Sequence, residues 1–120
     1  MIPRPYKQME GLESIRHSMV FNTAGSFDIG IVLPEDTRVH SAMIDVTEVF
    51  DGAPDSTLTI GDAGSAARFC DTSEVDLTTI GLYEVANYHN YATATQVVGT
   101  YVQNGATQGA AYIEVLYSAD

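Results

Sequence analysis

Apolar and polar side chains alternate along most of this chain, and this period of two constrains the fold more than any other feature of the sequence. Ile15, Met19 and Phe21 share one phase of the first run, and residues 27–33 repeat the pattern after a turn-forming stretch at 22–25. Such alternation is typical of a β-strand that buries one face. We therefore expect strands, and the sequence shows no amphipathic helix of ordinary length.

Turn-forming residues divide the chain into about eight runs of this kind. The expected strands cover residues 15–21, 27–33, 37–50, 57–60, 66–70, 77–86, 93–103 and 108–118. A change of phase near residues 42–44 indicates a bulge. We expect the first two strands to form a hairpin, and the last two to form another around Asn104 and Gly105. The sequence thus predicts an all-β fold, a single jelly-roll-like β-sandwich of about eight antiparallel strands.

The first residues do not share this alternation. Pro3 and Pro5 fix their own backbone angles and favour extended conformations in the residues before them. We expect an extended N-terminal arm over residues 1–13, followed by the β-sandwich domain over residues 14–120. Ile2, Arg4, Tyr6, Lys7 and Met9 are the predicted contact residues of this arm, toward a neighbouring subunit. The alternative is a frayed terminus.

The formal net charge is -11 at pH 7, which opposes binding to nucleic acid. Residues 1–16 hold three basic and two acidic side chains, whereas residues 17–120 hold two basic and fourteen acidic ones. A weakly basic N-terminal stretch, residues 1–16, therefore precedes an acidic body. No apolar run is long enough for a membrane span or a secretory signal, so we expect no membrane partner and synthesis in a cytoplasm.

Metal binding and catalysis receive little support from the sequence. Acidic side chains that could bind calcium, if their loops met, are Asp51, Asp55, Asp62, Asp71, Glu74 and Asp76. Aspartate is also common in turns because it bonds to the local backbone. The only cysteine, Cys70, excludes an intrachain disulfide, and the histidines His17, His40 and His89 lie outside any nucleophile motif. We expect no metal site, no cofactor, no catalytic residue and no enzymatic activity.

Aromatic residues gather in the stretch 87–91, which we expect to be a loop. Tyr83, Tyr88, His89 and Tyr91 are predicted to contact a ligand or another subunit, because tyrosine offers a large contact area with a polar tip. The alternative is that these rings cap one end of the sandwich.

Four segments carry a family resemblance. They are residues 38–50 (RVHSAMIDVTEVF), 56–61 (STLTIG), 74–83 (EVDLTTIGLY) and 109–115 (GAAYIEV). With the intervening residues 37–118, they resemble small structural proteins of tailed bacteriophages, in particular head decoration or cement proteins with a β-sandwich body. No catalytic or ligand-binding residue comes with this resemblance.

The resemblance implies a virion protein that binds the outer surface of the capsid and stabilises the shell. It implies the major capsid protein as partner, a homotrimer, and synthesis in the host cytoplasm. Two alternatives stay open: a receptor- or carbohydrate-binding module of a tail or fibre, and a tail-adaptor subunit.

Overall fold

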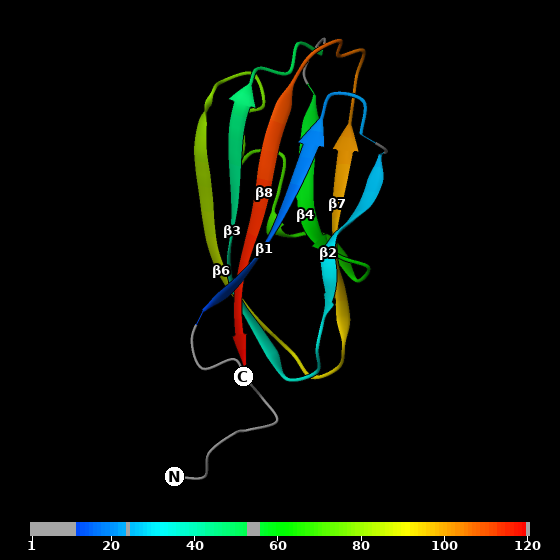
Figure 1. Ribbon diagram of the computed structural model, residues 1–120. Coiled ribbons are helices and arrows are strands. Elements are labelled where there is room, and N and C mark those ends of the chain that lie inside the picture. Colours follow the sequence, from blue (N-terminus) through cyan, green and yellow to red (C-terminus); the bar gives the residue numbers. More distant parts are fainter. Residues whose placement is uncertain (1–11, 24, 53–55, 120) are drawn as a thin grey trace.

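Two four-stranded sheets pack face to face in the computed structural model, which describes residues 12–23, 25–52 and 56–119 (Figure 1). The strands are β1 (Glu13–Val20), β2 (Ser26–Leu33), β3 (Thr37–Glu48), β4 (Thr57–Asp62), β5 (Ser65–Cys70), β6 (Gly81–Tyr91), β7 (Thr95–Val102) and β8 (Ala110–Ala119). Every paired ladder is antiparallel. The fold is the all-β sandwich that the alternation predicts. No helix of the described part is long and apolar enough to cross a membrane.

The strand order is β1-β8-β3-β6 in one sheet and β2-β7-β4-β5 in the other. Only the β4–β5 connection joins neighbouring strands of one sheet, and each of the other six connections passes from one sheet to the other. Two Greek keys folded over each other in this way give a jelly-roll-like sandwich. Figure 1 shows the consequence, since the last strand, β8, lies between β1 and β3.

The hairpin predicted for the first two strands is wrong. β1 pairs with β8 along its full length, and β2 pairs with β7. β1 and β2 belong to different sheets, and the connection that follows β1 is held by another connection: the Phe21 N–H donates to the Gly109 carbonyl at 3.0 Å. Alternation identifies a strand but does not specify its partner, because both faces of the sandwich need the same pattern.

The hairpin predicted around Asn104 and Gly105 is also wrong, although the turn itself is present. Both residues have positive φ, 51° and 80°, and the Ala106 N–H donates to the Gln103 carbonyl at 3.1 Å. The connection then continues to residue 109 and crosses to the other sheet, so β7 and β8 do not pair. A tight turn inside a longer connection does not bring its flanking strands together.

Two further predictions concern strands β3 and β6. The predicted change of phase is confirmed, with the irregularity in register between Val39 and Ser41 on both sides of β3. The prediction of an aromatic loop at residues 87–91 is wrong. These residues continue β6 and pair with the start of β3, where Val39 lies opposite His89. Strand pairing outweighs the turn preference of the two asparagines in this stretch.

The core lies between the sheets and is built from the inward phase of each strand. The largest fully buried side chains are Phe50, Phe69, Met19, Ile29, Leu33, Ile44, Leu58, Ile60, Leu77, Ile113, Val39 and Val46. Phe50 meets the ring of Tyr101 edge-on, with centroids 5.6 Å apart. Gly99 lies under the Phe27 ring, where a Cβ would come within 2.4 Å of a ring carbon, so glycine permits this close approach.

Candidate functional site

The four aromatic residues predicted to form one contact surface lie on β6 but do not face one way. Tyr88 is 69% exposed and meets the ring of His40 edge-on, with centroids 5.1 Å apart. Tyr83 is half-buried against the core, and its hydroxyl donates to the Thr79 carbonyl at 3.0 Å. Tyr91 is buried. Because successive strand residues point to opposite faces, Tyr88 stands apart from the other three.

His89 and Tyr91 belong to a ring cluster with Phe69 of β5. The His89 and Tyr91 centroids are 4.5 Å apart, and both rings meet Phe69 edge-on, at 6.3 and 6.2 Å. This cluster joins β6 of one sheet to β5 of the other. Its geometry matches the alternative in which the rings close part of the sandwich, and it leaves Tyr88 as the exposed aromatic group of β6.

The predicted arm contacts, Ile2, Arg4, Tyr6, Lys7 and Met9, lie outside the described residues. The described chain begins at Leu12, just before β1. Any contact made by the arm therefore stays a proposal.

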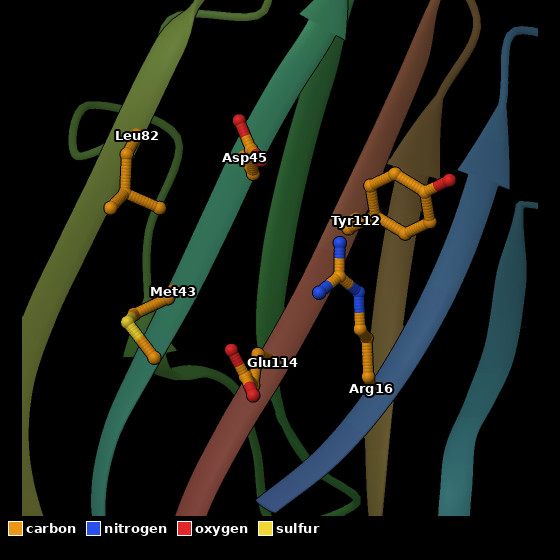
Figure 2. A pocket seen from close by; sticks show the side chains of 6 residues that line it. All are labelled: Arg16, Met43, Asp45, Leu82, Tyr112 and Glu114. Atoms are coloured by element: carbon orange, nitrogen blue, oxygen red, sulfur yellow. The ribbon is translucent and has the colours of Figure 1, made fainter.

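A shallow hollow of about 220 Å³ lies on the outer face of the β1-β8-β3-β6 sheet (Figure 2). Its lining side chains are Arg16 of β1, Met43 and Asp45 of β3, Leu82 of β6, and Tyr112 and Glu114 of β8. The register explains why these six meet: Glu114 lies opposite both Arg16 and Met43, and Asp45 lies opposite both Tyr112 and Leu82. The hollow thus occupies two adjacent cross-strand rows.

Charge and apolar surface alternate within this hollow. The Arg16 guanidinium carbon stands 4.2 Å from the centroid of the Tyr112 ring, a cation–π contact. Asp45 and Glu114 add two carboxylates, whereas Leu82 is 65% exposed. No serine, threonine, cysteine or histidine lines the hollow, so it offers contact with a polar or cationic side chain and no nucleophile. Sequence reasoning missed it because the six residues come from four separate strands.

One serine and one histidine do come together on the same sheet. Nε2 of His40 and Oγ of Ser118 are 2.7 Å apart, and the His40 ring also meets the ring of Tyr88 edge-on. His17, by contrast, is half-buried on β1 and stacks on Phe27 with centroids 5.3 Å apart. In the described residues, none of the three histidines is hydrogen-bonded to a carboxylate, so a complete Ser-His-Asp arrangement is missing there.

The acidic loop residues bind their own backbone. Oδ1 of Asp51 accepts hydrogen bonds from the Thr107 and Gln108 N–H groups, at 2.6 and 3.0 Å. Asp71 and Asp76 accept from the N–H and hydroxyl groups two residues further on. These hydrogen bonds, the side-chain hydroxyl first, lower the pKa of all three carboxyls. Within the ranges that the structure describes, no three His, Cys, Asp or Glu side chains group to hold a metal ion.

Asp62 is the one buried carboxylate of the described chain, and it has three kinds of partner. Arg68 Nε donates to Oδ2 at 2.6 Å, the Tyr91 hydroxyl donates to Oδ2 at 2.5 Å, and the Ser65 N–H donates to Oδ1 at 2.9 Å. Burial alone would raise the pKa of Asp62, but the hydrogen bonds from Arg68 and Tyr91 outweigh it and lower the pKa to about 2. This group is saturated by internal partners, so its role is structural.

No protein-family model matches the sequence, and no curated protein matches it.

Three solved structures contain chains that share this fold over nearly its whole length. A chain in the acidic stable capsid structure of Helicobacter pylori bacteriophage KHP30 is 16% identical with a TM-score of 0.73, over 93% of this chain and 90% of that one. A chain in the capsid asymmetric unit of cyanophage Pam1 is 21% identical with a TM-score of 0.70, over 100% and 93%. A chain in the capsid of Ralstonia phage GP4 is 20% identical with a TM-score of 0.62, over 100% and 91%.

These identities are low, so the likeness concerns the fold. The resemblance to small phage structural proteins is confirmed at that level: the chain has the same β-sandwich as chains in three phage capsid structures.

Proposed function

We propose that this chain is a structural protein of a phage virion, which binds the outer surface of the capsid as a decoration or cement protein and stabilises the shell. The supporting observation is the extent of the likeness to the three phage capsid chains. Each match covers at least 93% of this chain and at least 90% of the other. The two molecules in each pair are therefore similar as whole units, which a shared submotif would not produce.

The described side chains support a binding role over catalysis. The hollow on the β1-β8-β3-β6 sheet is shallow and lacks a nucleophile, and the buried carboxylate Asp62 is saturated by Arg68 and Tyr91. Cys70 is buried, and burial raises the pKa of its thiol to about 12, so the reactive thiolate is scarce at neutral pH. The proposed role is non-enzymatic.

One end of the sandwich carries a group of acidic connections and the arm attaches at the other end, which suggests an orientation on the particle. At one end, hydrogen bonds join the connections 21–25, 49–56, 71–80 and 103–109. The described residues of these connections include four carboxylates and no lysine, arginine or histidine. β1 begins at the opposite end, so the arm, residues 1–13, attaches there with two basic and two acidic side chains. In the proposed orientation the arm faces the major capsid protein and the acidic end faces outward.

The arm supplies the proposed contacts with the shell or with a neighbouring subunit. Ile2, Tyr6 and Met9 offer apolar anchors, and Arg4 and Lys7 offer positive charge. The proposed assembly is a homotrimer on the capsid, as in the family that the sequence resembles.

Particles of a phage that carries this gene, prepared without the protein, provide the test. Added wild-type protein should bind at a fixed number of copies per particle and raise the temperature at which the particles lose their DNA. Deleting residues 1–10, or replacing Tyr6 and Lys7 by alanine, should lower the occupancy, whereas Gln8→Ala should not. A wild-type protein that leaves the particles bare contradicts the proposal; full occupancy without residues 1–10 contradicts the anchoring role alone.

The alternative of a receptor- or carbohydrate-binding module draws less support from the geometry. Tyr83, His89 and Tyr91 lie on the side of β6 opposite to Tyr88, so the four do not form one stacking surface. Tyr88 and the hollow, both on the outer sheet face, are the described features that a glycan would meet. Glycan-array binding without any effect on particle stability would favour this alternative, and rings of sixfold or twelvefold symmetry would favour a tail adaptor.

A further inference from the structure

The outer face of β2, β7 and β4 is nearly free of charge. On β7, Val97, Gly99 and Tyr101 are buried, so Val98, Thr100 and Val102 point outward. Register places Thr57 beside Val102 and Thr59 beside Thr100, and Val32 of β2 lies in the last row of the same face. Asp28, on the edge strand β2, is the single charged residue of these rows. We call this surface the neutral face: Val32, Thr57, Thr59, Val98, Thr100 and Val102.

The opposite sheet shows that this neutrality is local. The outer face of β1-β8-β3-β6 carries Arg16, Asp45, Glu84 and Glu114 within two neighbouring rows. The chain as a whole has a net charge of -11 over 120 residues. A face of four rows with one charge is therefore unusual for this molecule, and protein interfaces are likewise depleted of charge at their centres.

The side chains of the neutral face are also available for contact with another molecule. Val32 and Val102, at its two ends, are 51% and 53% exposed. The hydroxyls of Thr57, Thr59 and Thr100 make no hydrogen bond to another residue of the described chain. Short β-branched side chains lose little conformational entropy when they become buried, and hydroxyls serve as donors or acceptors across an interface.

A second copy of this chain is the occupant that the charge distribution favours. Two copies that each carry a net charge of -11 repel one another, and the repulsion is weakest where their contacting surfaces hold no carboxylates. A partner with a basic surface would instead match the acidic loops or the carboxylates of the other sheet. We propose that the neutral face is the surface through which copies of this chain contact one another in the oligomer. This inference rests on the proposed function only for the existence of a homo-oligomer.

Sedimentation velocity of the full chain over a range of concentrations tests this. The wild-type protein should sediment as an oligomer. Val102→Glu should weaken self-association by at least about tenfold, because it brings a new carboxylate against a copy of the same acidic protein. Thr100→Glu, at the centre of the face, should have the same effect. Val20→Glu is the matched control: the same substitution at a valine that is 45% exposed on β1, in the other sheet.

The outcomes separate this inference from the proposed function. A wild-type monomer at every concentration overturns it, and so does a Val20→Glu effect as large as that of Val102→Glu. If both face variants keep the wild-type distribution and the folded circular dichroism spectrum, the inference is also wrong. If the wild-type protein is monomeric and Val102→Glu abolishes its binding to particles, the neutral face contacts the capsid shell and not a second copy of this chain. If the wild-type protein self-associates but binds no particle, and Val102→Glu abolishes the self-association, the inference holds and the proposed capsid role is wrong.

Discussion

The hydroxyl of Tyr91 donates a 2.5 Å hydrogen bond to Oδ2 of Asp62 and thereby links the two sheets. Tyr91 ends β6 in one sheet, and Asp62 ends β4 in the other. Arg68 of β5 binds the same carboxylate oxygen, and both residues of the Tyr91–Asp62 pair are largely buried. Burial first, and then the hydrogen bond to Asp62, raise the pKa of Tyr91, so it keeps its proton at any physiological pH.

This pair predicts a pH dependence of stability. The folded pKa of Asp62 is about 2, below its ordinary 3.8, so the ionised carboxylate stabilises the fold above pH 3.8 and loses this effect as the pH falls through about 2. A shift of this size corresponds to about 2 kcal/mol at neutral pH. Asp62→Asn should therefore lower the free energy of unfolding at pH 7, and the gap to wild type should shrink toward pH 2. Urea unfolding at several pH values measures it, and a gap that does not change with pH contradicts it.

Tyr91→Phe should destabilise the fold by about 1–3 kcal/mol at pH 7, because it leaves the buried Asp62 carboxylate without one of its donors. Tyr88→Phe is the control on the same strand, where the side chain is exposed and its loss of a hydroxyl should change stability by less than about 0.5 kcal/mol. Chemical unfolding of both variants compares them. Equal effects would mean that the hydroxyl of Tyr91 has no special partner.

Gly99→Ala should destabilise the fold by about 1–3 kcal/mol through overpacking. The new Cβ would meet Cζ of Phe27, a partly buried ring that packs against the core, at 2.4 Å. Gly64→Ala offers a comparison, since its nearest neighbour, Oδ1 of Asp62, would be 3.4 Å away. Thermal unfolding should show a clear loss for the first variant and a loss of less than about 1 kcal/mol for the second. The reverse order would refute the packing argument.

Cys70 should resist thiol reagents in the folded protein. Burial, followed by the nearby carboxylates Glu74 and Asp71, raises the pKa of its thiol to about 12, so little thiolate forms at pH 8. In guanidinium chloride the same thiol should react at the rate of an ordinary exposed cysteine. The ratio of the two modification rates is the measurement, and comparable rates in both states would show that the site opens in the native protein.

The alternation of side chains was sufficient to predict the strands and the sandwich. β3 illustrates this, because its buried positions follow the predicted phase and change phase at Ser41 and Ala42, next to the irregularity in register. Alternation does not specify which other strand each strand pairs with. The turns at 22–25 and 104–105 have the composition of hairpin turns, yet each belongs to a connection that crosses between the sheets.

The candidate sites depend on strand order for the same reason. Tyr88 and His89 are neighbours in sequence, but the pleat of β6 sends them to opposite faces. Arg16, Asp45, Leu82 and Glu114 are far apart in sequence, and they line one hollow because β1, β8, β3 and β6 lie in that order. No spacing pattern predicts either result. The neutral face likewise emerges only when β2, β7 and β4 are placed side by side.

The central position of β8 has a kinetic consequence. β1 pairs along its whole length with β8, and β3 has β8 as one of its two neighbours, so the first sheet closes only after residues 110–119 have left the ribosome. Pairings between residues so distant in sequence form slowly, because the chain loses the conformational entropy of closing a long loop before the strand contacts form. Until then β1 has no partner on either edge, and unpaired strand edges recruit strands from other chains. Rapid completion of translation, or a chaperone that holds the nascent strands, should therefore raise the yield of correctly folded protein.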